Sequence, residues 1–200
     1  GLVGSEMCIR DSISKEFKVV NLIEAYRSRG HLFTKTNPVR ERRHYFPTLD
    51  IENFGLSKED LNKKFNSATQ TGMPGPATLQ EIITHLQNIY CDSIGVEYMH
   101  IQNVEEKKWI MEWVNVNENH PTLSAEEKTE ILFKLNQAVA FENYLHTKFV
   151  GQKRFSLEGG ESLIPALDQL ITRSSQLGVD EVVLGTVSYT HLTLPTIYSV

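Results

Sequence analysis

Apolar residues recur at helical spacing along most of the chain. The first clear stripe, at positions i, i+3, i+4 and i+7, consists of Val19, Leu22, Ile23 and Tyr26. It predicts a helix whose apolar face packs on a core. Gly30 follows the stripe, at a position where helices often end in a left-handed glycine, so we expect the helix to stop there.

Paired polar residues mark the starts of further helices. In each pair a Ser, Thr or Asn precedes an acidic residue by three positions, which is the spacing of a helix cap or capping box. The pairs are Ser57 with Asp60, Thr78 with Glu81, Asn103 with Glu106, and Ser124 with Glu127. The apolar stripes behind them predict one short helix and three longer ones, over about 58–65, 79–90, 104–119 and 125–150.

Five apolar residues form a broad face on the expected helix at 104–119: Trp109, Trp113 and Val116, with Ile110 and Val114 beside them. Tryptophans at this spacing are usually part of a core, so we expect them to be buried. The preceding apolar run at 94–101 is too short for its pattern to distinguish a helix from a strand.

The end of the chain has the pattern strand, helix, strand. Apolar and polar residues alternate over 155–158, as in a strand, and Gly159 and Gly160 then permit a turn. Apolar residues at helical spacing follow up to Gly178, and 181–185 is a second short apolar run. This order is typical of a parallel α/β unit. We therefore predict an α/β fragment that is predominantly helical, with a helical N-terminal domain followed by one β-α-β unit.

The predicted domain boundary lies at residue 150. Residues 13–150 are expected to form the helical domain, and 151–185 the start of the α/β domain. The flanking segments 1–12 and 186–200 are similar to translated sequencing adaptor, and we leave them out of the expected fold as artefactual tails.

Composition narrows the class of protein. A net charge of −5 and a pI near 5.8 argue against a protein that mainly binds nucleic acid. The basic and aromatic segment 40–47 would support salt-dependent RNA binding, but it is one short cluster in an acidic chain, and we interpret it as a solvated turn. No apolar run reaches the roughly 18 residues of a membrane span. Cys8 and Cys91 are too few for a disulfide framework, which favours a reducing compartment.

Catalytic motifs with clear spacing are scarce. Glu97 and His100 form a single Glu-x-x-His, whereas a carboxylate-bridged metal pair requires two such motifs and further glutamates. The sequence contains no zinc-hydrolase, Cys-x-x-Cys or phosphate-loop motif, so we predict no metal site. The turn at 158–160 could offer backbone N–H groups to an anion, or it could be a bare turn.

Three stretches, in order along the chain, carry a resemblance to a known family. They are Ala25 to Leu32 (AYRSRGHL), Ile89 to Ile101 (IYCDSIGVEYMHI) and Gly151 to Pro165 (GQKRFSLEGGESLIP), the last flanked by FENYLHTKF and EVVLG. Long ordered matches are more specific than one short motif. The segment 13–185 resembles 2-oxoglutarate dehydrogenase, the thiamine-diphosphate-dependent decarboxylating component of its complex.

The resemblance implies a role for the last part of the chain. The β-α-β unit would begin a thiamine-diphosphate-binding fold, and Phe155 would line the substrate pocket with Lys153, Arg154 and Ser156 as neighbours. The family continues after the second strand with Met-Ala-His-Arg-Gly-Arg, whereas Ser188 occupies the place of that histidine here. A serine hydroxyl does not accept a proton near neutral pH as imidazole does. We therefore expect no intact catalytic residue and an inactive isolated chain.

The resemblance also implies a reaction, cofactors and partners for the parent protein. The reaction is oxidative decarboxylation of 2-oxoglutarate in the tricarboxylic acid cycle, with transfer of the succinyl group to a lipoyl group. The cofactors are thiamine diphosphate and Mg²⁺, whose binding motif in the family lies farther along the chain. The partners are the lipoyl-bearing succinyltransferase, dihydrolipoyl dehydrogenase and a second copy in a homodimer. No nucleic acid or membrane is expected.

Compartment and specificity stay open. The location would be the cytoplasm of a bacterium or the mitochondrial matrix of a eukaryote. One alternative is a relative specific for 2-oxoadipate. Another is a noncatalytic helical interaction module that keeps the same scaffold.

Overall fold

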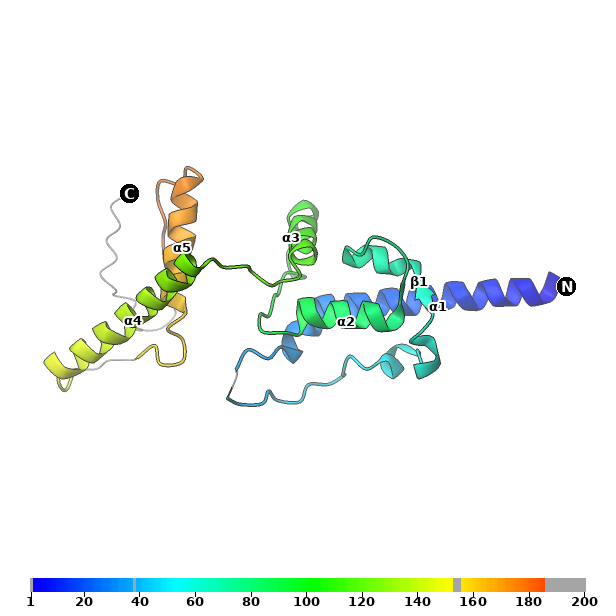
Figure 1. Ribbon diagram of the computed structural model, residues 1–200, viewed down its shortest axis with the longest axis horizontal. Coiled ribbons are helices and arrows are strands. Elements are labelled where there is room, and N and C mark those ends of the chain that lie inside the picture. Colours follow the sequence, from blue (N-terminus) through cyan, green and yellow to red (C-terminus); the bar gives the residue numbers. More distant parts are fainter. Residues whose placement is uncertain (1, 38, 153–155, 186–200) are drawn as a thin grey trace. The chain divides into compact units, whose positions relative to one another are not determined.

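The computed structural model describes residues 2–37, 39–152 and 156–185, with side chains from residue 12 onward. The chain divides into two compact units, Gly1–Pro121 and Thr122–Val200 (Figure 1). The predicted boundary at residue 150 concerns the domains of a longer parent protein and stays a prediction. Most of the described elements are helices, which confirms the predominantly helical character of the chain.

The first unit is built on two helices that contact each other, α1 (Leu2–Arg29) and α2 (Leu79–Tyr90). The other elements of this unit are short 3-10 turns, two short strands and a third helix: η1 (Gly30–Phe33), η2 (Ile51–Phe54), η3 (Lys58–Asp60), β1 (Lys64–Phe65), η4 (Asn66–Thr71), β2 (Ala77–Thr78) and α3 (Val104–Val116). The strands are antiparallel, with Lys64 opposite Thr78 and Phe65 opposite Ala77. No pattern in the sequence had indicated this pair.

The core of the first unit forms around α1 and α2. Val19, Leu22 and Ile23 of α1 have no exposed surface, and Tyr26 has only 2%, which confirms the predicted stripe. From α2 the core receives four aliphatic residues that also lie at helical spacing: Leu79, Ile82, Leu86 and Ile89. Because each fully buried aliphatic side chain stabilises the fold by about 1.5–3 kcal/mol, this contact is the main source of stability in the unit.

Gly30 follows α1 for a different reason from the one predicted. It begins the turn η1 and is not among the residues with a positive φ, so the prediction of a left-handed cap was wrong. A Cβ built at residue 30 would lie 2.5 Å from the Cβ of Tyr90. The close contact with Tyr90 therefore requires glycine. Gly178, by contrast, has a φ of 84° after the last helix and ends it as expected.

The predicted caps form in the structure. Capping boxes join Ser57 to Asp60, Thr78 to Glu81 and Ser124 to Glu127, and the side chain of Asn103 accepts hydrogen bonds from two backbone N–H groups of α3. The first box begins only the turn η3, and not a helix to Phe65, because the chain enters β1 at Lys64. The segment 94–101, for which the sequence pattern could not distinguish a helix from a strand, forms neither.

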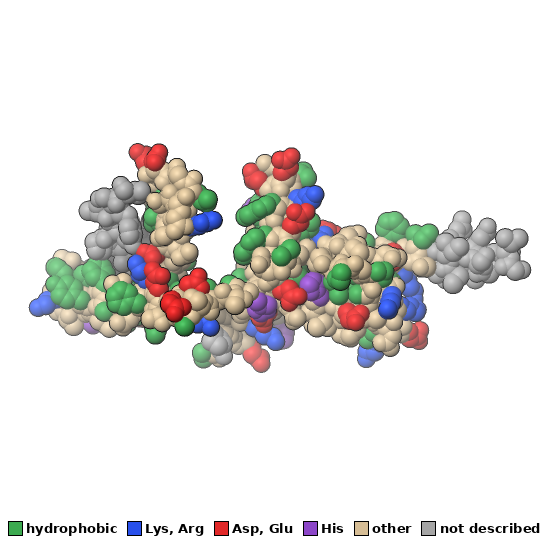
Figure 2. Space-filling view, turned by 45° about the horizontal axis from the view of Figure 1, so that its top comes forward, with side chains coloured by type: hydrophobic (Ala, Val, Ile, Leu, Met, Phe, Trp, Pro, Cys, Tyr) green, Lys and Arg blue, Asp and Glu red, His purple; other side chains and the backbone are tan. Residues whose placement is uncertain are grey.

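The tryptophan face of α3 is exposed, contrary to the prediction. Trp109 and Trp113 have 66% and 53% of their surface exposed, and Val116 has 81%. Val114, with 2% exposed, turns the opposite side of the helix into the core. Figure 2 shows hydrophobic side chains on the outer surface of α3. The spacing could not decide between the two faces, since both are apolar.

The second unit consists of α4 (Ala125–Lys148) and α5 (Leu163–Gln176), which contact each other. An ion pair joins the two helices, with 2.9 Å between Lys134 Nζ and Asp168 Oδ1. Ala138 is the buried hydrophobic residue of α4, whereas Leu132, Phe133 and Tyr144 are more than half exposed. The described part of this unit therefore has little core of its own.

The β-α-β unit is not formed among the described residues. Its helix is present as α5, but Ser156, Leu157 and the segment 181–185 are irregular. Phe155 lies outside the described residues. A parallel strand requires a neighbouring strand for its backbone hydrogen bonds, and the described residues provide none beside 181–185. The prediction of two strands there is corrected, and the thiamine-diphosphate-binding fold remains an expectation for the parent.

Candidate functional site

The residues predicted to bind substrate can be followed only in part. Ser156 is described, and it is exposed in an irregular segment. Lys153, Arg154 and Phe155 lie outside the described residues, as does Ser188 at the place of the family histidine. Their assignment therefore stays a prediction from the sequence.

Backbone N–H groups at the turn before α5 already donate to carboxylates of the chain itself. The Gly159 N–H donates to Glu161 Oε2 over 3.0 Å, and the Gly160 N–H donates to the Leu157 carbonyl over 2.6 Å. Glu142 of α4 accepts a hydrogen bond of 2.6 Å from the Leu157 N–H. Gly159 has a φ of 85°, which suits glycine at this turn. Two of the three N–H groups, those of Leu157 and Gly159, therefore already donate to carboxylates, and the Gly160 N–H donates to a carbonyl.

The described residues offer no cluster of ligands for the magnesium ion of the expected cofactor. No cluster of three or more His, Cys, Asp or Glu that could hold a metal ion occurs among them. Glu97 of the single Glu-x-x-His motif instead lies 3.0 Å from the Nε2 atom of His31. Within the same part of the chain, no helix is both long and apolar enough to cross a membrane.

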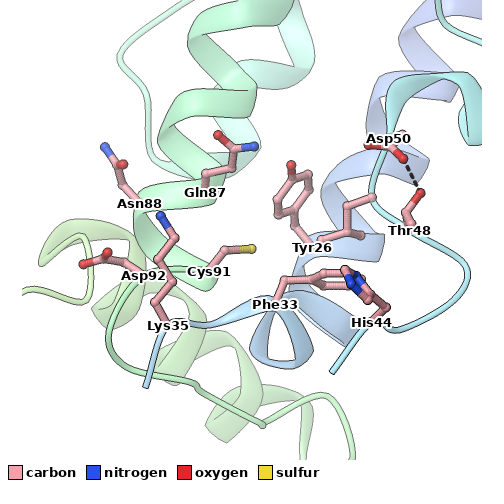
Figure 3. Close-up of a pocket in the computed structure, with 11 residues that line it drawn as sticks. Tyr26, Phe33, Lys35, His44, Thr48, Asp50, Gln87, Asn88, Cys91 and Asp92 are labelled. Carbon is pink, nitrogen blue, oxygen red and sulfur yellow. Dashed lines mark hydrogen bonds between the residues drawn. The ribbon is translucent and has the colours of Figure 1, made fainter. Parts of the chain in front are cut away.

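A cavity of about 550 Å³ opens in the first unit between α1, α2 and the segment 33–50 (Figure 3). The contributions are Tyr26 from α1, Gln87 and Asn88 from α2 with Cys91 and Asp92 just beyond it, and Phe33, Lys35, His44, Thr48, Leu49 and Asp50 from the segment. A backbone hydrogen bond of 2.7 Å from the Lys35 N–H to the Asp92 carbonyl fixes the segment beside the end of α2.

Two titratable groups of this cavity, Cys91 and Tyr26, suit binding better than covalent chemistry. Burial raises the pKa of the Cys91 thiol to about 12, so the thiolate needed for nucleophilic attack is scarce near neutral pH. Burial likewise raises the pKa of Tyr26 to about 12, against a hydrogen bond with Gln87. A neutral phenol, a neutral thiol and two amides leave a wall that hydrogen-bonds and packs without reacting.

A buried network of polar side chains joins the end of α2 to α3 in the first unit, and sequence patterns did not reveal it. The hydroxyls of Tyr90 and Tyr98 are 2.9 Å apart, and Tyr90 also donates to Asn115 Oδ1 over 3.4 Å. Arg27 has 6% of its surface exposed and donates through Nη2 to the Gln70 carbonyl. Burial raises the pKa of Tyr98 well above its usual range, so both phenols stay protonated and the network is structural.

Comparison with known proteins identifies several proteins whose sequences are similar to this chain. It matches no protein-family model. It is 44% identical over 181 residues to the multifunctional 2-oxoglutarate metabolism enzyme of Mycolicibacterium vanbaalenii, and 44% identical over 178 residues to the 2-oxoglutarate dehydrogenase E1/E2 component of Corynebacterium glutamicum. The 2-oxoglutarate dehydrogenase E1 component of Brucella ovis is 40% identical over 178 residues.

These matches cover most of this chain and little of the relatives. They include 86–88% of the chain but only 14–17% of the length of each relative. At 40–44% identity over so many residues, common ancestry accounts for the similarity, and the resemblance noted in the sequence is confirmed. The chain therefore belongs to the 2-oxoglutarate dehydrogenase E1 family, and it spans 14–17% of the length of the relatives it matches.

Proposed function

We propose that the chain is a segment of a 2-oxoglutarate dehydrogenase that decarboxylates 2-oxoglutarate and transfers the succinyl group to a lipoyl group. The observation that supports this proposal is the 40–44% identity to three relatives named for 2-oxoglutarate metabolism or its dehydrogenase. The parent would use thiamine diphosphate and Mg²⁺. It would act in the tricarboxylic acid cycle with a lipoyl-bearing succinyltransferase and dihydrolipoyl dehydrogenase, as a homodimer.

Within that parent, the two described units would have different parts. The first unit, with its packed core of α1 and α2, would be a helical support. The second would lead into the catalytic domain, where Phe155, Lys153, Arg154 and Ser156 would face the substrate. We expect the isolated chain to be inactive, since its described residues include no cluster of ligands for Mg²⁺. The compartment would be the cytoplasm of a bacterium or a mitochondrial matrix.

An assay on the gene product tests this function. The complete gene would be expressed, and decarboxylation of 2-oxoglutarate would be followed by reduction of ferricyanide, with and without thiamine diphosphate and Mg²⁺. We expect turnover that requires both cofactors, and none from the 200-residue chain at the same concentration. Faster turnover of 2-oxoadipate would reassign the substrate. A complete product that turns over neither acid would favour a noncatalytic interaction module on the same scaffold.

A second experiment uses the isolated 200-residue chain. Calorimetric titration with thiamine diphosphate should give no saturable heat that requires Mg²⁺, because the described residues contain no cluster of ligands that could hold the ion. Saturable binding that requires Mg²⁺ would contradict the expected inactivity and would require a cofactor site within this segment.

A further inference from the structure

A second hollow lies beside the cavity of Figure 3, and the residues that line it all belong to the segment 33–45. It has a volume of about 780 Å³ and shares Phe33 and Lys35 with that cavity. We call it the basic hollow, because four cationic side chains line it: Lys35, Arg40, Arg42 and Arg43. Glu41 is its one carboxylate, so the lining carries an excess of three positive charges.

This excess charge is not neutralised within the described part of the chain. Eight ion pairs join described residues, and none involves Lys35, Arg40, Arg42 or Arg43. Acidic residues outnumber basic ones in the whole chain, which has a net charge of −5. Even so, no described carboxylate forms an ion pair with these four cations. Positive charge concentrated in a concave site, in an acidic protein, attracts an anion from solution.

Local hydrogen bonds hold the side chain of Arg42 and the backbone at Arg40. The Nη1 group of Arg42 donates to the side chain and the carbonyl of Thr34, which is 1% exposed. The side chain of Asn37 accepts hydrogen bonds from the backbone N–H groups of Val39, at 2.9 Å, and Arg40, at 3.2 Å. Among the described residues Arg42 donates through Nη1 alone, which leaves its other N–H groups for a ligand. A site ordered before binding loses less entropy when a ligand enters.

An aromatic pair forms one wall of the basic hollow. The rings of Phe33 and Tyr45 meet edge to face, with centroids 6.4 Å apart. Aromatic rings beside cations suit a ligand that has an organic part as well as a charged group. The volume of the hollow is that of a small-molecule site.

We propose that the basic hollow binds a small organic phosphate or diphosphate. The planar guanidinium of arginine matches phosphate oxygens in two-point contacts, and a phosphate carries enough charge to balance several cations. A nucleic acid would be expected to follow a basic stripe across an open face, whereas these cations line a hollow. The proposal does not depend on the enzymatic function of the parent.

Titration of the 200-residue chain with sodium pyrophosphate at low ionic strength tests the proposal. We expect saturable binding by calorimetry. The affinity should fall about tenfold or more in the variant Arg40→Gln/Arg43→Gln, which removes two charge-assisted contacts. The control Lys58→Gln/Lys128→Gln changes the charge equally at two exposed lysines outside the hollow and should bind as tightly as the wild type. Circular dichroism confirms that each variant is folded.

Four results would overturn the proposal. The first is the absence of saturable heat, and the second is an equal loss of affinity in the lysine control, which would indicate general charge attraction. The third is citrate binding as tightly as pyrophosphate, which would assign the hollow to carboxylates. The fourth is single-stranded RNA that binds at nanomolar concentration while pyrophosphate does not, which would assign the loop to nucleic acid.

Discussion

At the scale of single residues, two positions hold the first unit together through contacts that span many residues of sequence. Gly30 lets the chain after α1 touch Tyr90 at the end of α2. Asp60 is 2% exposed and accepts hydrogen bonds from Lys15, Lys63 and the Ser57 N–H. A methyl group at residue 30, or a neutral side chain at residue 60, therefore changes a contact inside the fold.

The variant Gly30→Ala should destabilise the chain by about 1–3 kcal/mol, the usual cost of forcing extra atoms into a packed site. Its new Cβ would lie 2.5 Å from the Cβ of Tyr90. The matched control is Gly75→Ala, since a Cβ at residue 75 has no atom within 4 Å. Urea unfolding measures both. Equal stabilities for the two variants would show that the contact with Tyr90 yields without cost.

The pKa of Asp60 predicts a pH-dependent contribution to stability. Burial acts to raise this pKa, and the hydrogen bonds from Lys15, Lys63 and the Ser57 N–H outweigh it, so the pKa lies well below its usual range. Because the folded pKa is below the unfolded value of about 3.9, the stabilisation is present above about pH 4 and is lost as the pH falls.

The variant Asp60→Asn should therefore lower the free energy of unfolding by about 1–3 kcal/mol at pH 7, given that both lysines are partly exposed. The difference from the wild type should shrink as the pH falls below about 4. Urea unfolding at several pH values measures it, with the exposed Glu52→Gln as control. A difference that stays constant from pH 7 to pH 3 would contradict the role of the charge.

At the scale of elements, α3 shows how an apolar pattern can leave the buried face undecided. Its outer face carries Trp109 and Trp113, more than half exposed, while Val114 is 2% exposed. Both faces are apolar, so helical spacing alone could not choose between them. The choice depends on Val114 packing in the cluster of the first unit, formed by residues distant in the sequence.

We expect Val114→Ala to destabilise the first unit more than Trp109→Ala does, although the tryptophan loses many more atoms. The buried valine leaves a cavity and should cost about 1–3 kcal/mol, whereas the exposed tryptophan should cost about 0.5 kcal/mol or less. Thermal unfolding of the two variants compares them. A larger loss for Trp109→Ala would mean that the tryptophan face is the packed one.

The same contrast explains how far the sequence predicts the fold. Caps and stripes depend on residues within one or two turns of one another, and the boxes at Thr78 and Ser124 form as predicted. The β1–β2 pair, the contact of Gly30 with Tyr90 and the cavity of Figure 3 join segments far apart in the chain. The spacing of apolar residues along the chain carries no information about such long-range contacts. The strands expected at 155–158 and 181–185 depend in the same way on neighbours that the described residues do not supply.

At the scale of the whole molecule, the two units differ in how much core they contain. The first buries a continuous cluster that includes four residues of α1 and five of α2. In the second, Ala138 is the buried residue of α4, and α5 has none. Isolated helices are marginal in water, so the stability of a helix follows the apolar surface that it buries. The second unit should therefore open more easily.

Hydrogen exchange measures this difference directly. Amides in the central turns of α2 should exchange about tenfold or more slowly than those of α4 and α5, because local opening is easiest where few apolar contacts break. The test is informative because α4, with 24 residues, is twice as long as α2, with 12, and length alone would favour α4. Equal or slower exchange in α4 would contradict the assignment of the core to the first unit.

Sequencing of the source gene across the codon of Gly185 would show whether this chain is part of a 2-oxoglutarate dehydrogenase. We expect the reading frame to continue into a segment with Met-Ala-His-Arg-Gly-Arg, in place of Ser188 and its neighbours, and then into a diphosphate-binding motif. A frame that stops near Gly185, or continues without the histidine and arginine, would contradict the enzymatic claim and leave a noncatalytic helical module.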